Sequence, residues 1–278
     1  MVPDRDAPLS AAPRVAPPEA PAATVAVVRS DNRRGAVAEA LALLDAEVRP
    51  ILAGPVAILT HLGPTGAGST SPSALSSVLD VVLSADPGAV TIASGSRRAR
   101  ERFASRGFLD ECWGRPVRFL DLARDEDGWE VVDRPSGGPL RLSGTIAEAG
   151  CRIALSPLSA LRRGPACLLA VRQAIRPADL PGFDGEPIPR AWPDLSIIEG
   201  KLGWRGRSAL AVAGLDPMAV DAVAAKLLGI DRRRAERLGA PGRIAVVGDA
   251  EGTARPIRAA STPGLRRDSG HPDRGGTS

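Results

Sequence analysis

The sequence predicts an α/β protein in which a mostly parallel sheet is flanked by helices, a three-layer arrangement of βαβ units. Two observations lead to this prediction. Short apolar runs rich in Val, Ile and Ala alternate with segments whose apolar residues recur at helical spacing, a pattern typical of βαβ units. In addition, 44% of the residues are hydrophobic but only 3% are aromatic, and aliphatic packing suits buried parallel strands covered by helices.

The first half of the chain shows this alternation in order. Strands are predicted at 24–30, 55–63, 89–96, 117–123 and 128–133, and helices at 34–48, 73–85 and 97–108. In the first helix Val37, Leu41 and Leu44 recur at helical spacing. Gly107 is expected to end the third helix.

The second half repeats the rhythm. Strands are predicted at 151–158, 195–200, 209–216 and 242–249, and the apolar segment 166–175 is either a helix or a buried run. A further helix follows Asp216, because aspartate caps helices well and Pro217 fits a first helical turn. Gly229 is positioned to end it.

The two ends of the chain differ from the centre. Residues 1–23 are rich in Pro and Ala, and residues 252–278 lack apolar periodicity. Both segments are therefore expected to be disordered tails. The region between them, 24–251, is predicted to be a single α/β domain.

The net charge of +4 does not indicate a nucleic-acid partner. Residues 252–278 contain five arginines and two aspartates and contribute +3, and residues 1–23 contribute −1, so the centre of the chain carries only +2. A nucleic-acid-binding surface would gather its cations on one face of the fold. We expect no nucleic-acid partner.

Membrane spans, signal peptides and metal sites are not indicated either. No run approaches 18 apolar residues, and the N-terminal segment lacks the apolar core of a secretory signal. Cys112, Cys151 and Cys167 form no CxxC pair, so neither a metal site nor an iron–sulfur cluster is expected within this chain. These cysteines are interpreted as small core residues, and their sparse number fits a reducing cytoplasm.

Four segments carry a resemblance to a known family. They are TVAVVRS, TIASGSRRARERFASRGF, PDLSIIEGKLGWRGRS and AVAGLDPMAVDAVAAKLLGID. Together they resemble the domain-of-unknown-function 362 family over about 24–249, most strongly at 193–231. Many members of that family are found with iron–sulfur ferredoxin-like modules. The resemblance implies a redox-metabolism enzyme or accessory protein that acts on a small molecule.

The sequence departs from the family pattern at two basic motifs. ILTHLGP stands where Lys-Pro-Asn is usual after the second strand, and Ser159, Ala160 and Leu161 stand where Lys-x-His is usual. Two alternatives to an enzyme therefore stay open. One is a non-catalytic small-molecule-binding protein, and the other is a structural subunit that forms a homo-oligomer or pairs with an intact relative or a ferredoxin-like partner. The sequence identifies no cofactor.

Asp216 and Asp221 are the first candidate catalytic residues. Capping alone explains Asp216, and a ligand role is the alternative. Asp221 lies at the margin of the apolar stripe of its helix, about 100° from Val220. It is expected either to pair with an Arg or Lys or to face a cleft at the strand ends.

Glu199 and His61 are candidates because each lies at the end of a predicted strand. A carboxylate beside a glycine at such an edge is a reasonable ligand group, and a lone histidine there is a possible acid–base group near neutral pH. The alternative for His61 is a structural role.

The loop of Ser94, Gly95 and Ser96 is a candidate cofactor-binding segment. It follows a strand and opens a helix, so its small residues and the helix amides can cradle an anion, with Arg97 or Arg98 assisting. It lacks a full dinucleotide-binding or P-loop motif, and a solvated basic helix start is the alternative.

These candidates are expected to converge. Because the carboxyl ends of parallel strands meet at one edge of a sheet, we expect Glu199, Asp216 and Asp221 to lie near one cleft, with His61 and the Ser94–Ser96 loop on its rim. Such a cleft would be acidic and would favour a cation or a hydroxyl-rich ligand.

Overall fold

The computed structural model describes residues 22–64, 68–125, 128–134, 137–183, 185–202, 208–230 and 243–249. Within them, an eight-stranded sheet has the strand order β10-β1-β9-β8-β7-β2-β3-β4. Every neighbouring pair is parallel except the two pairs that include β9. The predicted mostly parallel α/β fold is confirmed.

The elements follow the predicted order closely. The strands of the large sheet are β1 (Ala23–Ser30), β2 (Pro55–Thr60), β3 (Ala89–Ser94), β4 (Arg118–Asp121), β7 (Cys151–Pro157), β8 (Leu195–Leu202), β9 (Ser208–Gly214) and β10 (Ile244–Gly248). The α-helices are α1 (Arg33–Leu43), α2 (Asp45–Val48), α3 (Pro72–Ser84), α4 (Ala99–Ser105), α5 (Phe108–Glu111), α6 (Gly144–Ala147), α7 (Ala166–Ala174) and α8 (Pro217–Leu227). Short 3-10 helices are η1 (Arg49–Leu52), η3 (Leu122–Arg124), η4 (Leu158–Arg162), η5 (Leu180–Gly182) and η6 (Pro189–Ala191).

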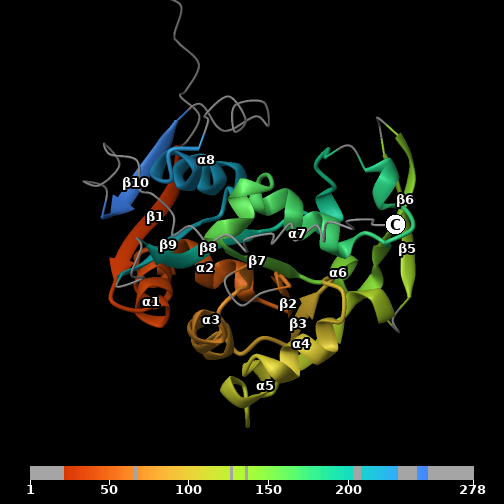
Figure 1. Cartoon of the computed structure of the whole chain (residues 1–278), viewed down its shortest axis with the longest axis horizontal. Coiled ribbons are helices and arrows are strands. Elements are labelled where there is room, and N and C mark those ends of the chain that lie inside the picture. Colours follow the sequence, from red (N-terminus) through yellow and green to blue (C-terminus); the bar gives the residue numbers. More distant parts are fainter. Residues whose placement is uncertain are drawn as a thin grey trace, which may run out of the picture.

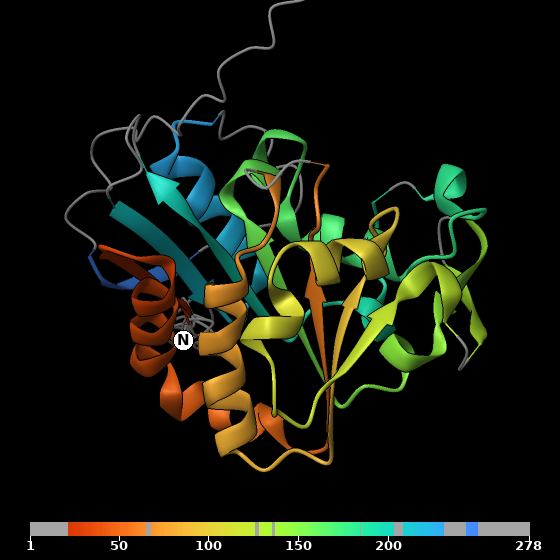
Figure 2. The same ribbon diagram turned by 60° about the horizontal axis from the view of Figure 1, so that its bottom comes forward.

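Helices cover both faces of the sheet, which gives the three layers (Figure 1). Helices α1, α3, α4 and α5 pack on one face, where α1 and α3 lie side by side (Figure 2). Helix α8 packs on β1, β8 and β9 on the other face, and α7 packs there on β7 and β2. Alternate strand residues therefore point into different cores: Ile197 lies in the α1/α3 core, whereas Ile198 lies in the α8 core.

Local sequence signals set the helix ends. The Asn32 side chain caps α1 by accepting the amide of Gly35 at 2.8 Å. Pro72 and Pro217 occupy the first turns of α3 and α8, where proline lacks a donor that the helix would leave unused. Gly107 has φ +77° and separates α4 from α5, as a left-handed glycine at a helix end does.

Strand β9 runs against the other strands because its connection to β8 is short. Leu202 of β8 pairs with Ser208 of β9, so only 203–207 separate the two strands. A parallel crossover needs a dozen or more residues. The strands therefore form a hairpin, and the carboxyl end of β9 lies at the edge opposite to that of β8.

A second, two-stranded sheet is formed by β5 (Trp129–Arg134) and β6 (Gly137–Ser143). It lies at the opposite end of the molecule from β10 (Figure 1). The sequence predicted β5 but not β6, whose Gly-Gly-Pro start breaks the β-branched pattern. The side chains of Leu140 and Leu142 are buried and pack β6 against the core that includes α7.

The domain boundaries stay predictions. The first strand begins at Ala23, one residue before the predicted start of the domain. The proposed tails lie, apart from residues 22 and 23, outside the described residues. No helix in the described part of the chain is long and apolar enough to cross a membrane.

Candidate functional site at the carboxyl edge of the sheet

The carboxyl ends of β8, β7 and β2 are joined by hydrogen bonds from the segment that follows β2. The amide of Ser71 donates to Glu199 Oε1 at 2.9 Å, and Thr70 Oγ1 donates to the Leu155 carbonyl at 2.8 Å. Thr70 Oγ1 also accepts the amide of His61 at 3.0 Å. We call this chain of contacts, from Glu199 to His61, the edge network.

Glu199 is the buried end of the edge network. Its side chain is fully buried, and its Oε2 lies 3.4 Å from Nε of Arg33, the first residue of α1. Neither of these two atoms has a hydrogen-bond partner in the described residues. Burial raises the pKa of Glu199, while Arg33 and the Ser71 amide act in the opposite direction. Glu199 therefore ties the starts of α1 and α3 to the sheet and presents no surface to a ligand.

His61 is the titratable group at the other end. Its side chain is partly exposed, and Nε2 lies 3.4 Å from Nη1 of Arg163. This distance exceeds that of a normal hydrogen bond, so the imidazole is only weakly held by Arg163. Burial lowers the pKa of His61 below its usual 6.5, and the charges of Arg163 and Arg102 lower it further. The imidazole is therefore neutral at neutral pH and can accept a proton.

Two arginines of α4 and its end hold the chain after His61. Arg102 donates to the Leu62 carbonyl, and Arg106 donates to the carbonyl of Gly63 at 2.6 Å and to Ser69 Oγ. Through these contacts, the helix predicted at 97–108 anchors the chain that follows His61. They also place two positive charges beside the edge network.

The loop of Ser94, Gly95 and Ser96 lies beside the chain that follows His61. Ser96 Oγ accepts the amide of Leu62, the residue after His61, at 3.0 Å. The donors of this loop already have partners, however. The Gly95 amide donates to Gln173 Oε1 at 3.2 Å, and the Ser96 amide donates to Ser94 Oγ at 3.3 Å.

Gly95 is required by the close approach of α7. A Cβ at this position would lie 2.6 Å from the carbonyl oxygen of Gln173. The loop and α7 therefore fit together through a glycine contact and the Gln173 side chain. This arrangement favours a structural role, and anion binding by the loop stays a prediction.

A cavity of about 260 Å³ lies at the start of α7 and includes Arg163, the neighbour of His61. Its lining residues are Arg163, Gly164, Pro165, Leu168, Leu169, Arg172, Phe183 and Gly185. The guanidinium of Arg172 lies 5.8 Å from the ring centroid of Phe183, within the range of a cation–π contact. The described lining thus combines two cations with an apolar wall.

Asp216 lies at the opposite edge of the sheet from this site. It follows β9, and Gly214 at the end of β9 pairs with Ser196 near the start of β8. Its Oδ1 accepts the amides of Met218 and Ala219, both at 2.9 Å. The predicted cap is confirmed. The predicted convergence with Glu199 is wrong, because β9 is antiparallel.

Asp221 is buried between α8 and α7. Its carboxylate accepts the amide of Ala166 at 2.9 Å and that of Cys167 at 3.1 Å. It therefore caps α7 and lies on the face of the sheet opposite to the α1/α3 core that Glu199 adjoins. The three acids do not share a cleft, and Asp221 pairs with backbone amides instead of an Arg or Lys.

The predicted acidic character of the edge is also wrong. The charged side chains that contact the edge network and the chain after His61 in the described residues are Glu199, Arg33, Arg102, Arg106 and Arg163. Cations outnumber the single acid, which is already paired. The edge therefore favours an anion over a cation.

The described residues contain no group of three or more His, Cys, Asp or Glu side chains arranged to hold a metal ion. The three cysteines are free and buried, as predicted for core residues. Burial raises the pKa of Cys112 to about 11 and that of Cys151 to about 12, and it also raises the pKa of Cys167. None of them is suited to act as a thiolate.

Sequence reasoning missed Arg33, Arg163 and Gln173. For Arg163 a signal was present, because the segment LRRGP follows β7 at the carboxyl edge. It lies just beyond the position of the missing Lys-x-His match. Arg33 and Gln173 belong to helices on opposite faces of the sheet, and nothing in their local sequence indicates their contacts.

Comparisons with known proteins place few constraints on this chain. No family model matches it, and no curated protein matches it. Among solved structures, the lactate racemase apoprotein from Thermoanaerobacterium thermosaccharolyticum aligns at 15% identity with a TM-score of 0.42. The alignment covers 69% of this chain and 54% of the racemase chain, so this chain corresponds to about half of that protein. Similarity at this level does not bear on activity.

Proposed function

We propose that this chain binds a small organic carboxylate at the carboxyl edge of its sheet and that His61 accepts a proton from the bound molecule. The observation that carries the proposal is the pairing of a neutral, partly exposed imidazole with a guanidinium, His61 and Arg163, at 3.4 Å. Arginine suits planar anions such as carboxylates. A histidine held neutral is a suitable general base.

The cavity at the start of α7 supplies the remaining contacts. Arg163 and Arg172 offer donors to a carboxylate, and Leu168 and Phe183 offer an apolar wall. A volume of about 260 Å³ suits a molecule smaller than the drug-sized ligands of cavities of about 300–1,000 Å³. The bound anion would then lie beside His61.

Proton transfer in this arrangement needs no further reactant. The bond between hydrogen and the carbon next to the carboxylate breaks, the electron pair stays on the substrate, and the proton moves to Nε2 of His61. When the bound carboxylate neutralises the charge of Arg163, one cause of the lowered pKa of His61 is removed. The pKa of His61 then rises, which favours this transfer. Return of this proton to the same face restores the substrate, whereas protonation of the opposite face by water gives its mirror image.

A non-catalytic binding protein is the second candidate. It is favoured by the structural use of the three acids expected in the site, Glu199, Asp216 and Asp221, since all of them accept hydrogen bonds from amides at helix starts. Membership of the domain-of-unknown-function 362 family, a role in redox metabolism, a ferredoxin-like partner and a cytoplasmic location are further proposals. They rest on the sequence motifs and the cysteine content alone.

The test is hydrogen exchange. The full chain is incubated in D₂O with 2-hydroxy and 2-amino carboxylates of three to five carbons, and loss of the signal of the C–H next to the carboxylate is followed by NMR. We expect exchange of at least one probe, abolished in His61→Gln and weakened through a higher KM in Arg163→Gln. The adjacent exposed Arg162 provides the control, Arg162→Gln, which should behave as the wild type.

The outcomes separate the two candidates. Binding without exchange, weakened by Arg163→Gln but unchanged by His61→Gln, would support the non-catalytic candidate and refute the role of His61. Absence of both binding and exchange for every probe would refute the proposal.

A further inference from the structure

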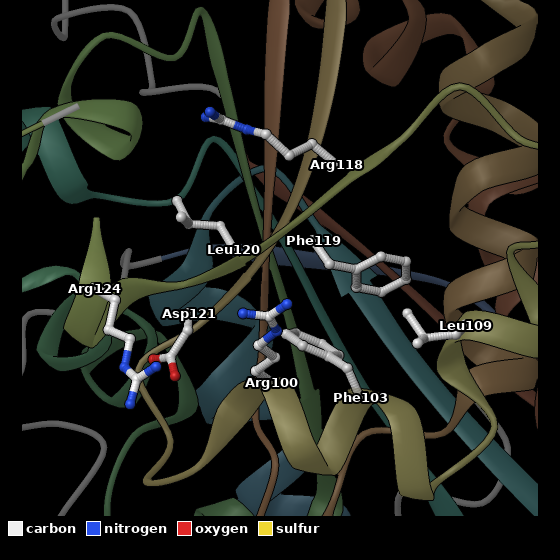
Figure 3. A pocket seen from close by; sticks show the side chains of 8 residues that line it. All are labelled: Arg100, Phe103, Leu109, Arg118, Phe119, Leu120, Asp121 and Arg124. Carbon is white, nitrogen blue, oxygen red and sulfur yellow. The ribbon is translucent and has the colours of Figure 1, made fainter. Parts of the chain in front are cut away.

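A larger cavity lies beside β4, the strand at one edge of the sheet, and shares no lining residue with the cavity at the start of α7 (Figure 3). Its volume is about 430 Å³. Its lining residues are Arg100, Phe103, Leu109, Arg118, Phe119, Leu120, Asp121 and Arg124. We call it the β4 cavity.

Its charged side chains come from three different elements. Arg100 belongs to α4, Arg118 and Asp121 to β4, and Arg124 to η3 (Figure 3). Three cations and one acid give the lining a charge of +2. The acid is partly used already, because Asp121 Oδ1 accepts the amide of Ala123 at 3.1 Å. The lining residues thus supply more cations than acids.

The floor of the β4 cavity is apolar. Phe103 is buried, and its ring packs on that of Phe119 with centroids 4.9 Å apart. Leu109 is 41% exposed although it is a large apolar residue. An apolar floor beneath a cationic rim is poorly matched to water and well matched to an amphipathic anion.

We propose that the β4 cavity binds a small organic anion with a carboxylate or phosphate group held by Arg100 and Arg124 and an apolar body on Phe119 and Leu109. Guanidinium groups bind both kinds of anionic group through paired hydrogen bonds. The volume lies within the usual range for small-molecule sites, about 300–1,000 Å³. The inference is independent of the function proposed for His61.

The experiment titrates the full chain with three probes in about 0.15 M salt, at which distant surface charges are screened. The probes are phenyl phosphate, benzoate and inorganic phosphate, and binding is followed by calorimetry. We expect at least one phenyl probe to bind about tenfold more tightly than inorganic phosphate, because burial of the ring adds apolar contact. The preference between phenyl phosphate and benzoate then identifies the anionic group.

Variants assign this binding to the cavity. Arg100→Gln and Arg124→Gln should each lower the affinity for the preferred phenyl probe by about tenfold, as expected for loss of a charge-assisted contact. Leu109→Ala should lower the affinity for the phenyl probe without changing the affinity for inorganic phosphate. The control is Arg49→Gln, since Arg49 is an exposed arginine that pairs with Asp45 one turn away, and this variant should bind the probes as the wild type does. Thermal melting shows that each variant is folded.

Three results would overturn the inference: no binding of either phenyl probe at millimolar concentration, equal affinity for all three probes, or no effect of Arg100→Gln and Arg124→Gln in folded protein. His61→Gln and Arg163→Gln distinguish the two sites. Neither substitution should change phenyl-probe binding at the β4 cavity, and a loss of that binding in both variants would assign it to the His61 site instead.

Discussion

The carboxylate of Asp221, inside α8, accepts the backbone amide of Cys167, at the start of α7, at 3.1 Å across 54 positions of the sequence. The same carboxylate accepts the amide of Ala166 at 2.9 Å. One buried side chain thus satisfies two free amides of a neighbouring helix, which otherwise have no intrahelical partner. Burial raises the pKa of Asp221 to about 6, and these hydrogen bonds act against the rise.

We predict that Asp221→Ala destabilises the fold by about 1–3 kcal/mol, because two buried amides lose their acceptor. The stability lost in Asp221→Ala depends on pH. Since the folded-state pKa of Asp221 is raised from 3.8 to about 6, the folded protein holds a proton that the unfolded chain has released, and wild-type stability falls as pH rises through this window. The difference between wild type and variant should therefore be larger at pH 4.5 than at pH 7.5 in urea unfolding. Equal differences at the two pH values would contradict the buried-acid account.

Asp216 should behave as a cap and nothing more. Asp216→Asn is expected to change the free energy of unfolding by less than about 0.5 kcal/mol, whereas Asp216→Ala should cost about 0.5–2 kcal/mol, because only asparagine still accepts the amides of Met218 and Ala219. Chemical denaturation of both variants measures this. Loss of carboxylate binding in folded Asp216→Asn would instead indicate a ligand role.

Loss of the ion pair between Glu199 and Arg33 should make the stability of the protein more dependent on pH. In Arg33→Gln the buried carboxyl loses its charge partner, so its pKa, already above the usual 4.5, rises further. A raised folded-state pKa means that stability falls as pH rises through the window above 4.5. Arg33→Gln should therefore lose more stability at pH 8 than at pH 5, up to about 3–5 kcal/mol for a broken buried pair.

The matched control for this pair is Glu199→Gln combined with Arg33→Gln. Glutamine keeps an acceptor for the Ser71 amide but carries no charge, so the double variant should lose the added pH dependence. Unfolding in urea at both pH values tests this. A steep dependence that persists in the double variant would mean that another group titrates.

The titration of His61 is directly observable, since the chain has only two histidines, His61 and His271. The NMR signal absent from His61→Gln identifies it. Its midpoint should lie below 6.5 and rise in Arg163→Gln, because that substitution removes one of the causes that lower the pKa. In the wild type the lowered pKa means that folded His61 binds fewer protons than His61 in the unfolded chain below pH 6.5. His61 therefore lowers the stability of the folded protein as pH falls below 6.5. A midpoint at or above 6.5 would remove the basis for a neutral base at this site.

Most of the fold was predictable because each element carries its own local signal. Aliphatic runs, helical spacing, Pro72, Gly107 and Asp216 locate strands, helices and their ends without reference to tertiary structure. Strand direction was the exception, although connection length contained the information: the gap between 195–200 and 209–216 is too short for a parallel crossover. Applying that rule would have placed Asp216 at the opposite edge.

The site was less predictable because its contacts are long-range. Leu62, the residue after His61, does meet the Ser94–Ser96 loop, since β2 and β3 are parallel neighbours and their ends coincide. The roles of Glu199 and Asp221 depend on which helix start lies above each carboxylate, and no local pattern specifies this. The same holds for the charge of the edge, which comes from arginines on separate helices and loops.

The placement of β1 has a consequence for synthesis of the protein. Its neighbours in the sheet are β9 and β10, which close the described chain. At roughly 5–20 residues per second, a ribosome needs on the order of 10–40 s after completing β1 to finish β9. Throughout that time the apolar run Val25–Val28, fully buried in the finished protein, has no strand to pair with. The newly made N-terminal segment is therefore a natural client for chaperones that bind nascent chains, and slow translation should lower the yield of folded protein.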